Sequence, residues 1–510
     1  MGKIVCYKKN GKLIPFGSGG DYTSLTPVYS DSVNGKFVIQ HSLITITRFI
    51  LNNMFEEFSL SVQHTYSGGL YSEIVSRVLL NESDISIMNE KLREIFQKSE
   101  PILSKYKERE ELLELFLDDE KKKFLIENST LEGAYYVEYN GIKDFFNTPL
   151  VPSTDYLEGA FYKYCPPGVV IYAGEEFKKE EQKKLFSVYL ESEKWAKILN
   201  WESVSQFDNT IESGEYAELI HVAEALHEKK IVEIAGAINE RRGRVKVVTI
   251  AGPSSSGKTT FLKRLSVQLR VLGISTVGIS LDNYFVDREK TPLDENGFPD
   301  YESIGAIDTD LFNEHLLKLT EGKSVHLPTF DFSVGKRKQE FMEYKIDKND
   351  IIIIEGIHGL NEKLTSSIKP EMKIKIYVSA LTQINIDDTH RISTTDNRLI
   401  RRIVRDYFFR SHTAEQTFEM WKSVRRGEER NIFPFQESAD YMFNSSLLYE
   451  FSIMKSFAEP LLREISEDRQ FYTDADRLIF MLSFFKPISI EIIPKTSVIR
   501  EFIGGSSFTY

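Results

Sequence analysis

The chain has 510 residues, a net charge of −12, 41% hydrophobic residues and 27% charged residues. This length is too great for a single hydrophobic core, so we expect at least two domains. The composition is that of a globular protein and excludes a disordered or fibrous class. The acidic balance argues against a surface that binds nucleic acid along its whole extent.

Targeting and redox features are sparse. The first residues carry no apolar signal segment, and no stretch reaches the roughly 18 apolar residues that a membrane span needs. The two cysteines, Cys6 and Cys165, lie far apart and lack the spacing of metal ligands. This usage is typical of a reducing compartment, so we expect a cytoplasmic protein without a membrane anchor.

The N-terminal part predicts a mixture of strands and helices. Residues 1–40 alternate short apolar runs with Gly, Ser and Asp, which indicates a small β-rich segment. Helical spacing follows over about 41–58, and a second, highly charged helix is expected over about 85–123. Strand and turn character returns over about 135–172. We assign residues 41–205 to one α+β domain.

The next segment indicates a domain boundary. Apolar residues recur at helical spacing over about 213–241 and predict a long amphipathic helix. This helix leads directly into a new apolar run. We therefore place a linking helix at 206–244.

The part that follows alternates short apolar runs with helical patterns. The runs lie at 245–250, 276–280, 351–354 and 374–378. Strands that are apolar on both faces belong in a parallel sheet covered by helices on each side. We predict an α/β nucleotide-binding domain at 245–470 and a C-terminal extension at 471–510.

Residues 252–259 read GPSSSGKT, which is the pattern of Gly, four residues and Gly-Lys-Ser/Thr. In this pattern glycines turn backbone N–H groups onto phosphate oxygens, and the following helix adds its positive N-terminus. Lys258 reaches the β- and γ-phosphates, and Thr259 supplies a hydroxyl to Mg²⁺. We expect ATP as the nucleotide, with GTP left open. The expected binding residues are Gly252, Ser254, Ser255, Ser256, Gly257, Lys258, Thr259 and Thr260.

Two further features fit a phosphate site. The run 351–354 ends in Glu355, where such a fold places the acid that holds Mg²⁺. A helical interpretation of the segment around 398–405 gathers most of its arginines on one face, with Arg410 nearby. Such a face would neutralise charge on a transferred phosphate and close over it as a lid.

Taken together, these residues resemble the uridine kinase and phosphoribulokinase branch of P-loop kinases over about residues 246–450. In that family an aspartate after the strand that follows the P-loop helix accepts the proton of the attacking hydroxyl. The resemblance assigns this role to Asp282 in the segment 280–285. The arginine run at 396–406 also resembles the family's lid. The resemblance implies catalytic roles for Asp282, Lys258, Arg398, Arg402 and Arg405, and phosphate contacts for Arg401 and Arg410.

The acceptor side matches the family less closely. The segment 330–332 is similar to a Tyr-Asp-Phe segment of uridine kinases, but Gly335 occupies the position of a histidine that reads the base. The family's ribose-binding aspartate falls on Gly305. Buried polar groups discriminate strongly between ligands, so the identity of the nucleoside stays open. The implied substrate contacts are Asp282, Tyr284, Phe330, Asp331, Phe332, Arg337 and Arg398.

Residues 1–200 resemble the N-terminal region of threonyl-tRNA synthetases. The editing site of that region uses two pairs of His or Cys residues, and in this chain their positions hold His41 and Thr45, then Phe146 and Leu150. Apolar side chains neither bind a metal nor move protons, so no editing activity is expected. A synthetase-like half before a kinase-like half is similar to a group of bacterial nucleoside kinase homologues. The tail at 500–508 also resembles theirs, and we expect it to dock on the kinase domain or on a second subunit.

The leading interpretation is an ATP- and Mg²⁺-dependent kinase of a small-molecule hydroxyl, with a nucleoside as the first choice of acceptor. A sugar, polyol or sugar phosphate is the alternative acceptor. A regulatory RNA-binding protein driven by a nucleoside triphosphate is a second interpretation, against which the acidic charge argues. A GTPase switch is disfavoured because no Asn-Lys-x-Asp guanine reader follows the P-loop. Whether the chain forms a homo-oligomer stays open.

Overall fold

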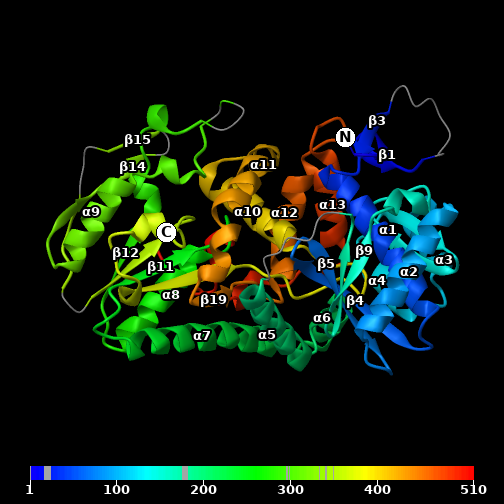
Figure 1. Ribbon diagram of the computed structural model, residues 1–510, viewed down its shortest axis with the longest axis horizontal. Helices are drawn as coiled ribbons and strands as arrows, with labels where there is room; N and C mark the ends of the chain where they lie inside the picture. Colours follow the sequence, from blue (N-terminus) through cyan, green and yellow to red (C-terminus); the bar gives the residue numbers. More distant parts are fainter. Residues whose placement is uncertain are drawn as a thin grey trace.

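The computed structural model describes residues 2–16, 25–174, 182–293, 297, 299–331, 334–338, 342–347 and 350–510. The N-terminal elements lie at one end of an elongated molecule and the sheet that carries the P-loop lies at the other (Figure 1). Helices from the C-terminal part of the chain lie between these two ends. The sequence order and the spatial order of the elements therefore differ.

The N-terminal half is a mixed α and β structure. Its strands are β1 (Ile4–Lys9), β2 (Lys12–Ile14), β3 (Thr26–Tyr29), β4 (Phe58–Tyr66), β5 (Gly69–Ser76), β6 (Leu103–Glu108), β7 (Gly133–Tyr139), β8 (Ile142–Phe146), β9 (Phe161–Cys165) and β10 (Gly168–Tyr172). Its helices are α1 (Val33–Asn52), α2 (Glu82–Lys98), α3 (Arg109–Leu115) and α4 (Glu120–Glu127). The strands pair in the orders β2-β1-β3, β4-β5-β10-β9 and β6-β7-β8.

Two boundaries in this half differ from the sequence prediction. Helix α1 begins at Val33, ahead of the predicted start at 41, because Ser32 caps it by accepting a hydrogen bond from the N–H of Gly35. The prediction of a single charged helix over 85–123 is wrong. Helix α2 ends at Lys98, and its C-cap Ser99 is left-handed with φ 49°. Pro101 follows, and the chain then forms β6, which pairs with β7.

A run of helices connects the halves. They are α5 (Lys183–Leu199), α6 (Val204–Ser213) and α7 (Tyr216–Glu240). Helix α7 confirms the amphipathic helix predicted over 213–241. Its buried face, which includes Ile231, Ile234 and Ile238, packs against Phe261 and Leu265 of α8 (Lys258–Val271). The linking helix therefore covers part of the sheet that carries the P-loop.

The central sheet of the second half has five strands in the order β12-β17-β11-β18-β19, and all of them are parallel. Its strands are β11 (Val247–Ala251), β12 (Thr276–Ser280), β17 (Ile351–Glu355), β18 (Lys373–Ser379) and β19 (Tyr441–Asn444). The four apolar runs predicted as strands are confirmed. Because the strands are parallel, their carboxyl ends share one edge of the sheet, where ligands of such folds bind.

The other elements of this half surround that sheet. The strands are β13 (Val325–Leu327), β14 (Phe330–Asp331), β15 (Lys336–Arg337) and β16 (Met342–Tyr344). The helices are α9 (Thr309–Thr320), α10 (Thr394–Arg410), α11 (Ala414–Asn431), α12 (Glu450–Arg463), α13 (Tyr472–Ser483) and α14 (Arg500–Ile503). Helices α10 to α13 lie between the sheet and the N-terminal half (Figure 1).

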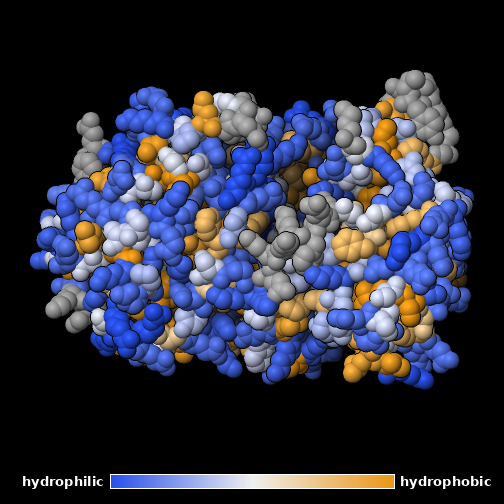
Figure 2. Space-filling model, in the orientation of Figure 1, coloured by the Kyte–Doolittle hydropathy of each residue, from blue (hydrophilic) through white to orange (hydrophobic). Residues whose placement is uncertain are grey.

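The largest hydrophobic core joins the two halves. It includes Phe145 of β8, Ile392 before α10, and Leu478 and Phe484 at α13. Residues on either side of 470 thus share one core. Among the described helices, none is long and apolar enough to cross a membrane. The face in Figure 2 is mostly hydrophilic, with apolar residues in small separate groups.

Candidate active site

The P-loop lies between β11 and α8 in a conformation that its glycines and serines permit. A Cβ on Gly252 would stand 2.0 Å from the carbonyl oxygen of Val378, so only glycine fits there. Gly257 has φ 79° and Ser255 has φ 58°. The Oγ atoms of Ser255 and Ser256 are buried without a hydrogen-bond partner. Buried polar groups that lack partners inside a glycine-lined turn fit a ligand with many acceptor oxygens, such as a triphosphate.

Three acidic or basic side chains meet at the ends of adjacent strands. Ser280 pairs with Glu355, and Glu355 pairs with Ile250, so β12, β17 and β11 end side by side. Lys258 Nζ lies 4.0 Å from the carboxylate of Glu355 and donates to the carbonyl of Pro253 at 3.1 Å. Asp282 follows β12 directly. The structure therefore brings Lys258, Glu355 and Asp282 together at one edge of the sheet.

The surroundings of this edge raise the pKa values of its two carboxyl groups. Crowding by protein atoms raises the pKa of Asp282 above its usual value, although Lys258, Arg410 and Arg405 act in the opposite direction. The Asp282 side chain still reaches solvent. Burial raises the pKa of Glu355 to about 7, against the effect of Lys258. A carboxylate with a raised pKa is a stronger base than a free one, which suits proton abstraction.

Helix α10 carries the arginines that were predicted to form a lid. Arg402 Nη1 donates to Ser254 Oγ at 2.7 Å, so this guanidinium touches the P-loop directly. Arg405 donates to Asp406 at 2.7 Å, and Arg410 lies 3.6 Å from the same carboxylate. The buried Asp406 thus holds three guanidinium groups near the P-loop side of α10.

Arg398 and Arg401 are fully buried and paired with carboxylates. Arg398 forms a bidentate ion pair with Glu428 of α11 and also donates to the carbonyl of Ser254 at 3.2 Å. Arg401 donates to Glu450 at 2.5 Å and to the carbonyl of Ser445 at 2.9 Å. Both arginines also donate to P-loop carbonyl oxygens, Arg398 to that of Ser254 and Arg401 to that of Ser255 at 3.5 Å, and each is paired with a buried carboxylate.

Two predicted substrate contacts, Tyr284 and Phe330, are buried in the hydrophobic core, and their role as substrate contacts stays a prediction. Tyr284 is fully buried, and its hydroxyl bonds to His315 Nδ1 at 3.0 Å while its ring packs on Phe312. Phe330 is buried beside Phe285, with ring centroids 5.7 Å apart. Aromatic side chains near a motif are the ones that fill a core, and the sequence alone does not separate these two roles.

Two other predicted acceptor contacts, Asp331 and Arg337, lie on β14 and β15, which pair with each other. Asp331 accepts from the N–H of Val334 at 3.4 Å, and Arg337 binds Asp308 at 3.0 Å and the carbonyl of Phe285 at 3.0 Å. A Cβ on Gly335 would stand 2.7 Å from Arg288 Nε. Phe332 lies outside the described residues. Arg337 fastens the hairpin to the segment after Asp282.

Sequence reasoning missed two carboxylates of the site. Glu428 accepts from the P-loop N–H of Ser254 at 3.0 Å in addition to its pair with Arg398. Glu302 lies against Gly427 of α11, and burial raises its pKa to about 7, with Glu428 adding to the effect and Arg402 and Lys258 opposing it. Neither residue falls in a spaced motif, because each reaches the site only through folding of distant segments.

The donor set fits a magnesium ion at the P-loop. Thr259 offers a hydroxyl oxygen and Glu355 a carboxylate oxygen, which are the hard ligands that Mg²⁺ prefers. Mg²⁺ keeps several waters and takes one or two protein oxygens besides phosphate oxygens. Two protein ligands are therefore sufficient.

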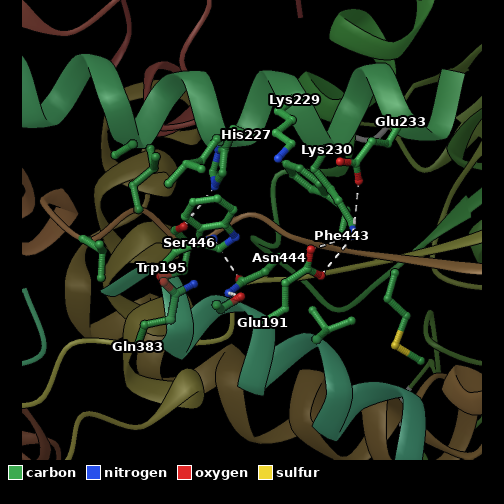
Figure 3. A pocket seen from close by; sticks show the side chains of 17 residues that line it. Glu191, Trp195, His227, Lys229, Lys230, Glu233, Gln383, Phe443, Asn444 and Ser446 are labelled. Atoms are coloured by element: carbon green, nitrogen blue, oxygen red, sulfur yellow. Dashed lines mark hydrogen bonds and ion pairs between the residues drawn. The ribbon is translucent and has the colours of Figure 1, made fainter. Parts of the chain in front are cut away.

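A separate cavity lies between α5, α7 and the end of β19 (Figure 3). It measures about 710 Å³ including open solvent. Its polar side chains bind one another: His227 contacts the carbonyl of Ser446 at 3.0 Å, and Lys230 pairs with Glu191 at 3.0 Å. Among the described residues that line it, none is a predicted site residue, so this cavity is not part of the candidate active site.

The chain matches known proteins over its second half. Residues 247–447 match the model of the Phosphoribulokinase / Uridine kinase family. A uridine kinase of Borrelia turicatae is 34% identical over 231 residues, which are 44% of this chain and 98% of that protein. A uridine kinase of Brevibacillus brevis is 32% identical over 184 residues, 36% of this chain and 77% of that protein.

A solved structure of a D-glycerate 3-kinase from Cryptococcus neoformans is 14% identical, with a TM-score of 0.30. The match covers 40% of this chain and 87% of the chain of that kinase. A likeness this low adds nothing to the argument. The 34% identity to the uridine kinase of Borrelia turicatae, over 98% of that protein, shows the family to which this chain belongs. The chain is a phosphotransferase that acts on a hydroxyl group, and it belongs to the phosphoribulokinase and uridine kinase family.

Proposed function

We propose that the chain is an ATP- and Mg²⁺-dependent kinase that phosphorylates a hydroxyl group of a nucleoside. The observation that carries this proposal is the meeting of Lys258, Glu355 and Asp282 at the ends of three adjacent parallel strands beside the P-loop. The uridine kinases to which the chain is similar support a nucleoside as acceptor. A sugar, polyol or sugar phosphate is the second candidate, because the histidine position of uridine kinases holds Gly335.

In the proposed reaction, Lys258 and the first amides of α8 hold the phosphates of ATP. Asp282 accepts the proton of the acceptor hydroxyl while the hydroxyl oxygen attacks the γ-phosphorus. The bond between the γ-phosphorus and its bridging oxygen breaks, and ADP leaves. Thr259 and Glu355 would hold Mg²⁺, which would supply positive charge to the phosphate oxygens. Arg402 and Arg405 add positive charge from α10.

Glu302 is our candidate for holding the acceptor. It lies near Lys258, Asp282 and Arg402, and its raised pKa of about 7 reflects the scarcity of solvent around it. A carboxylate in such a place accepts hydrogen bonds from hydroxyl groups, as a ribose or polyol would require. This assignment replaces the expected role of position 305, where Gly305 has no side chain to offer.

The test is Mg²⁺-dependent ATP consumption with a panel of nucleosides, ribose phosphates and polyols. We expect one class of acceptor to stimulate turnover, and Asp282→Asn to reduce kcat by about 10²- to 10⁴-fold, the usual contribution of a general base. Glu302→Gln should instead raise the KM of the acceptor while the KM of ATP stays near the wild-type value. Turnover that is indifferent to all small hydroxyl compounds and responds to RNA would refute the proposal.

The N-terminal half is proposed to be a threonyl-tRNA synthetase-like domain that has lost editing chemistry. His41 stacks on Phe146 with ring centroids 4.3 Å apart, so residues at two of the four editing positions are neighbours. Burial lowers the pKa of His41 to about 3, which keeps its imidazole neutral. Leu150 is buried and Thr45 binds the carbonyl of His41. We further propose that the protein acts in the cytoplasm on a small-molecule acceptor.

A further inference from the structure

The end of the chain returns to the kinase sheet and lies against the P-loop. The C-terminus is found over β11 and β12 in Figure 1. Val498, Ile499 and Phe502 are fully buried in the largest core. Arg500 donates to the carbonyls of Ile490 and Ile493 at 2.7 and 2.8 Å. The tail is thus anchored within the same chain, as one of the two arrangements expected from the sequence.

This anchored tail presents a carboxylate to the first turn of α8. Glu501 Oε2 accepts from the backbone N–H of Thr260 at 3.1 Å and from Thr260 Oγ1 at 2.6 Å. The hydroxyl of Tyr510 lies 2.8 Å from the same Oγ1. A Cβ on Gly257 would stand 2.5 Å from Val498 Cγ1, which shows how closely the tail approaches the P-loop.

The N–H of Thr260 belongs to the group that binds phosphate in a P-loop. The first N–H groups of a helix have no partner within the helix and attract anions, with help from the helix dipole. A carboxylate on this N–H takes the place of a phosphate oxygen. Two negatively charged oxygens on one donor repel each other, so the Glu501 contact and a phosphate at this position exclude each other.

We propose that Glu501 is a built-in competitor of the nucleotide: its carboxylate occupies the phosphate-binding N–H of Thr260, and a nucleoside triphosphate binds only after this carboxylate has moved away. The inference rests on the proposed nucleotide site. Because Val498, Ile499 and Phe502 are fully buried while Glu501 is half-buried, rotation of the Glu501 side chain is the smallest movement that clears the donor. The tail itself stays in place.

The experiment measures the Kd of a non-hydrolysable ATP analogue with Mg²⁺ by calorimetry on the full chain. Glu501→Gln keeps the shape of the side chain and removes its charge. We expect this variant to bind the analogue about tenfold more tightly than the wild type, which corresponds to about 1.4 kcal/mol of binding free energy. Glu501→Asp keeps the charge but shortens the reach and should also bind more tightly, which provides a second test if the first variant folds poorly. Glu491→Gln, an exposed glutamate before the tail, is the matched control and should equal the wild type.

Equal or weaker binding by both Glu501 variants would overturn the proposal and make Glu501 a cap of α8. If neither the wild type nor any variant binds the analogue, the proposed nucleotide site fails, and the competitor role fails with it. If the wild type binds the analogue and neither Glu501 variant binds it more tightly, the competitor role alone is refuted and the nucleotide site stands. The two failures are therefore distinct.

Discussion

At the residue scale, Asp208 shows how burial shifts the pKa of a carboxyl group. It lies on α6, is almost fully buried, and its Oδ1 has no hydrogen-bond partner. Burial raises its pKa to about 7, with Lys486 only partly opposing this. The folded protein therefore keeps a proton on Asp208 up to about pH 7, whereas the unfolded chain releases it near the ordinary aspartate pKa of 3.8.

The sign of the pH effect follows from this difference. Stability from Asp208 is highest at low pH and is lost as the pH rises from about 4 through about 7, because the folded state binds more protons in that window. Asp208→Asn lacks this loss. Its free energy of unfolding at pH 8 should therefore exceed that of the wild type by on the order of 2 kcal/mol, and its melting temperature should be higher. The difference should shrink towards pH 5. Asp118→Asn, at an exposed position, serves as control; a gain that is equal at both pH values would contradict the argument.

At the scale of single elements, α10 depends on buried ion pairs. Arg401 and Glu450 of α12 have fully buried side chains, and Glu450 also accepts from the N–H of Leu447 at 3.0 Å. Removing one partner of such a pair leaves an uncompensated charge, which costs about 3–5 kcal/mol. We expect Glu450→Gln to lower the melting temperature strongly and to reduce soluble yield. Glu464→Gln, exposed at the end of the same helix, should have little effect.

The predictability of the elements followed from their surroundings. Strands β11, β17 and β18 could be predicted because both of their faces are covered, which leaves continuous apolar runs. Strand β6 was missed because it is mostly exposed, and its charged residues look helical in isolation. At the site, Lys258 and Asp282 belong to local motifs and could be found. Glu302 and Glu428 reach the site from distant segments and belong to no motif that assigns them a role, so the sequence did not identify them.

At the scale of the whole molecule, a buried network joins the two halves. Lys122 of α4 binds Asp144 of β8 at 2.5 Å and Asp387, from the segment before α10, at 2.6 Å. Thr389 adds a bond to Asp144 at 2.9 Å. Burial alone would lower the pKa of Lys122, but Asp144 and Asp387 raise it above its usual value, so the lysine stays charged. Because the segment from 387 leads into α10, this network fixes the start of the arginine helix against the N-terminal half.

The final prediction tests whether this junction holds the molecule together. Lys122→Met keeps the length of the side chain but removes the cation that Asp144 and Asp387 share, while Arg48 still pairs with Asp144 at 2.8 Å. We expect a loss of about 3 kcal/mol, at the lower end of what removing one partner of a buried pair costs, and a lower melting temperature. Lys121→Met is the matched control. Lys121 is next to Lys122 in the chain, its side chain is 82% exposed, and it lies 3.4 Å from Asp388 in a surface pair worth about 0–1 kcal/mol. Calorimetry of both variants decides. Equal small effects would mean that this ion network does not hold the halves together, whereas a large loss only in Lys122→Met makes the network part of what positions α10.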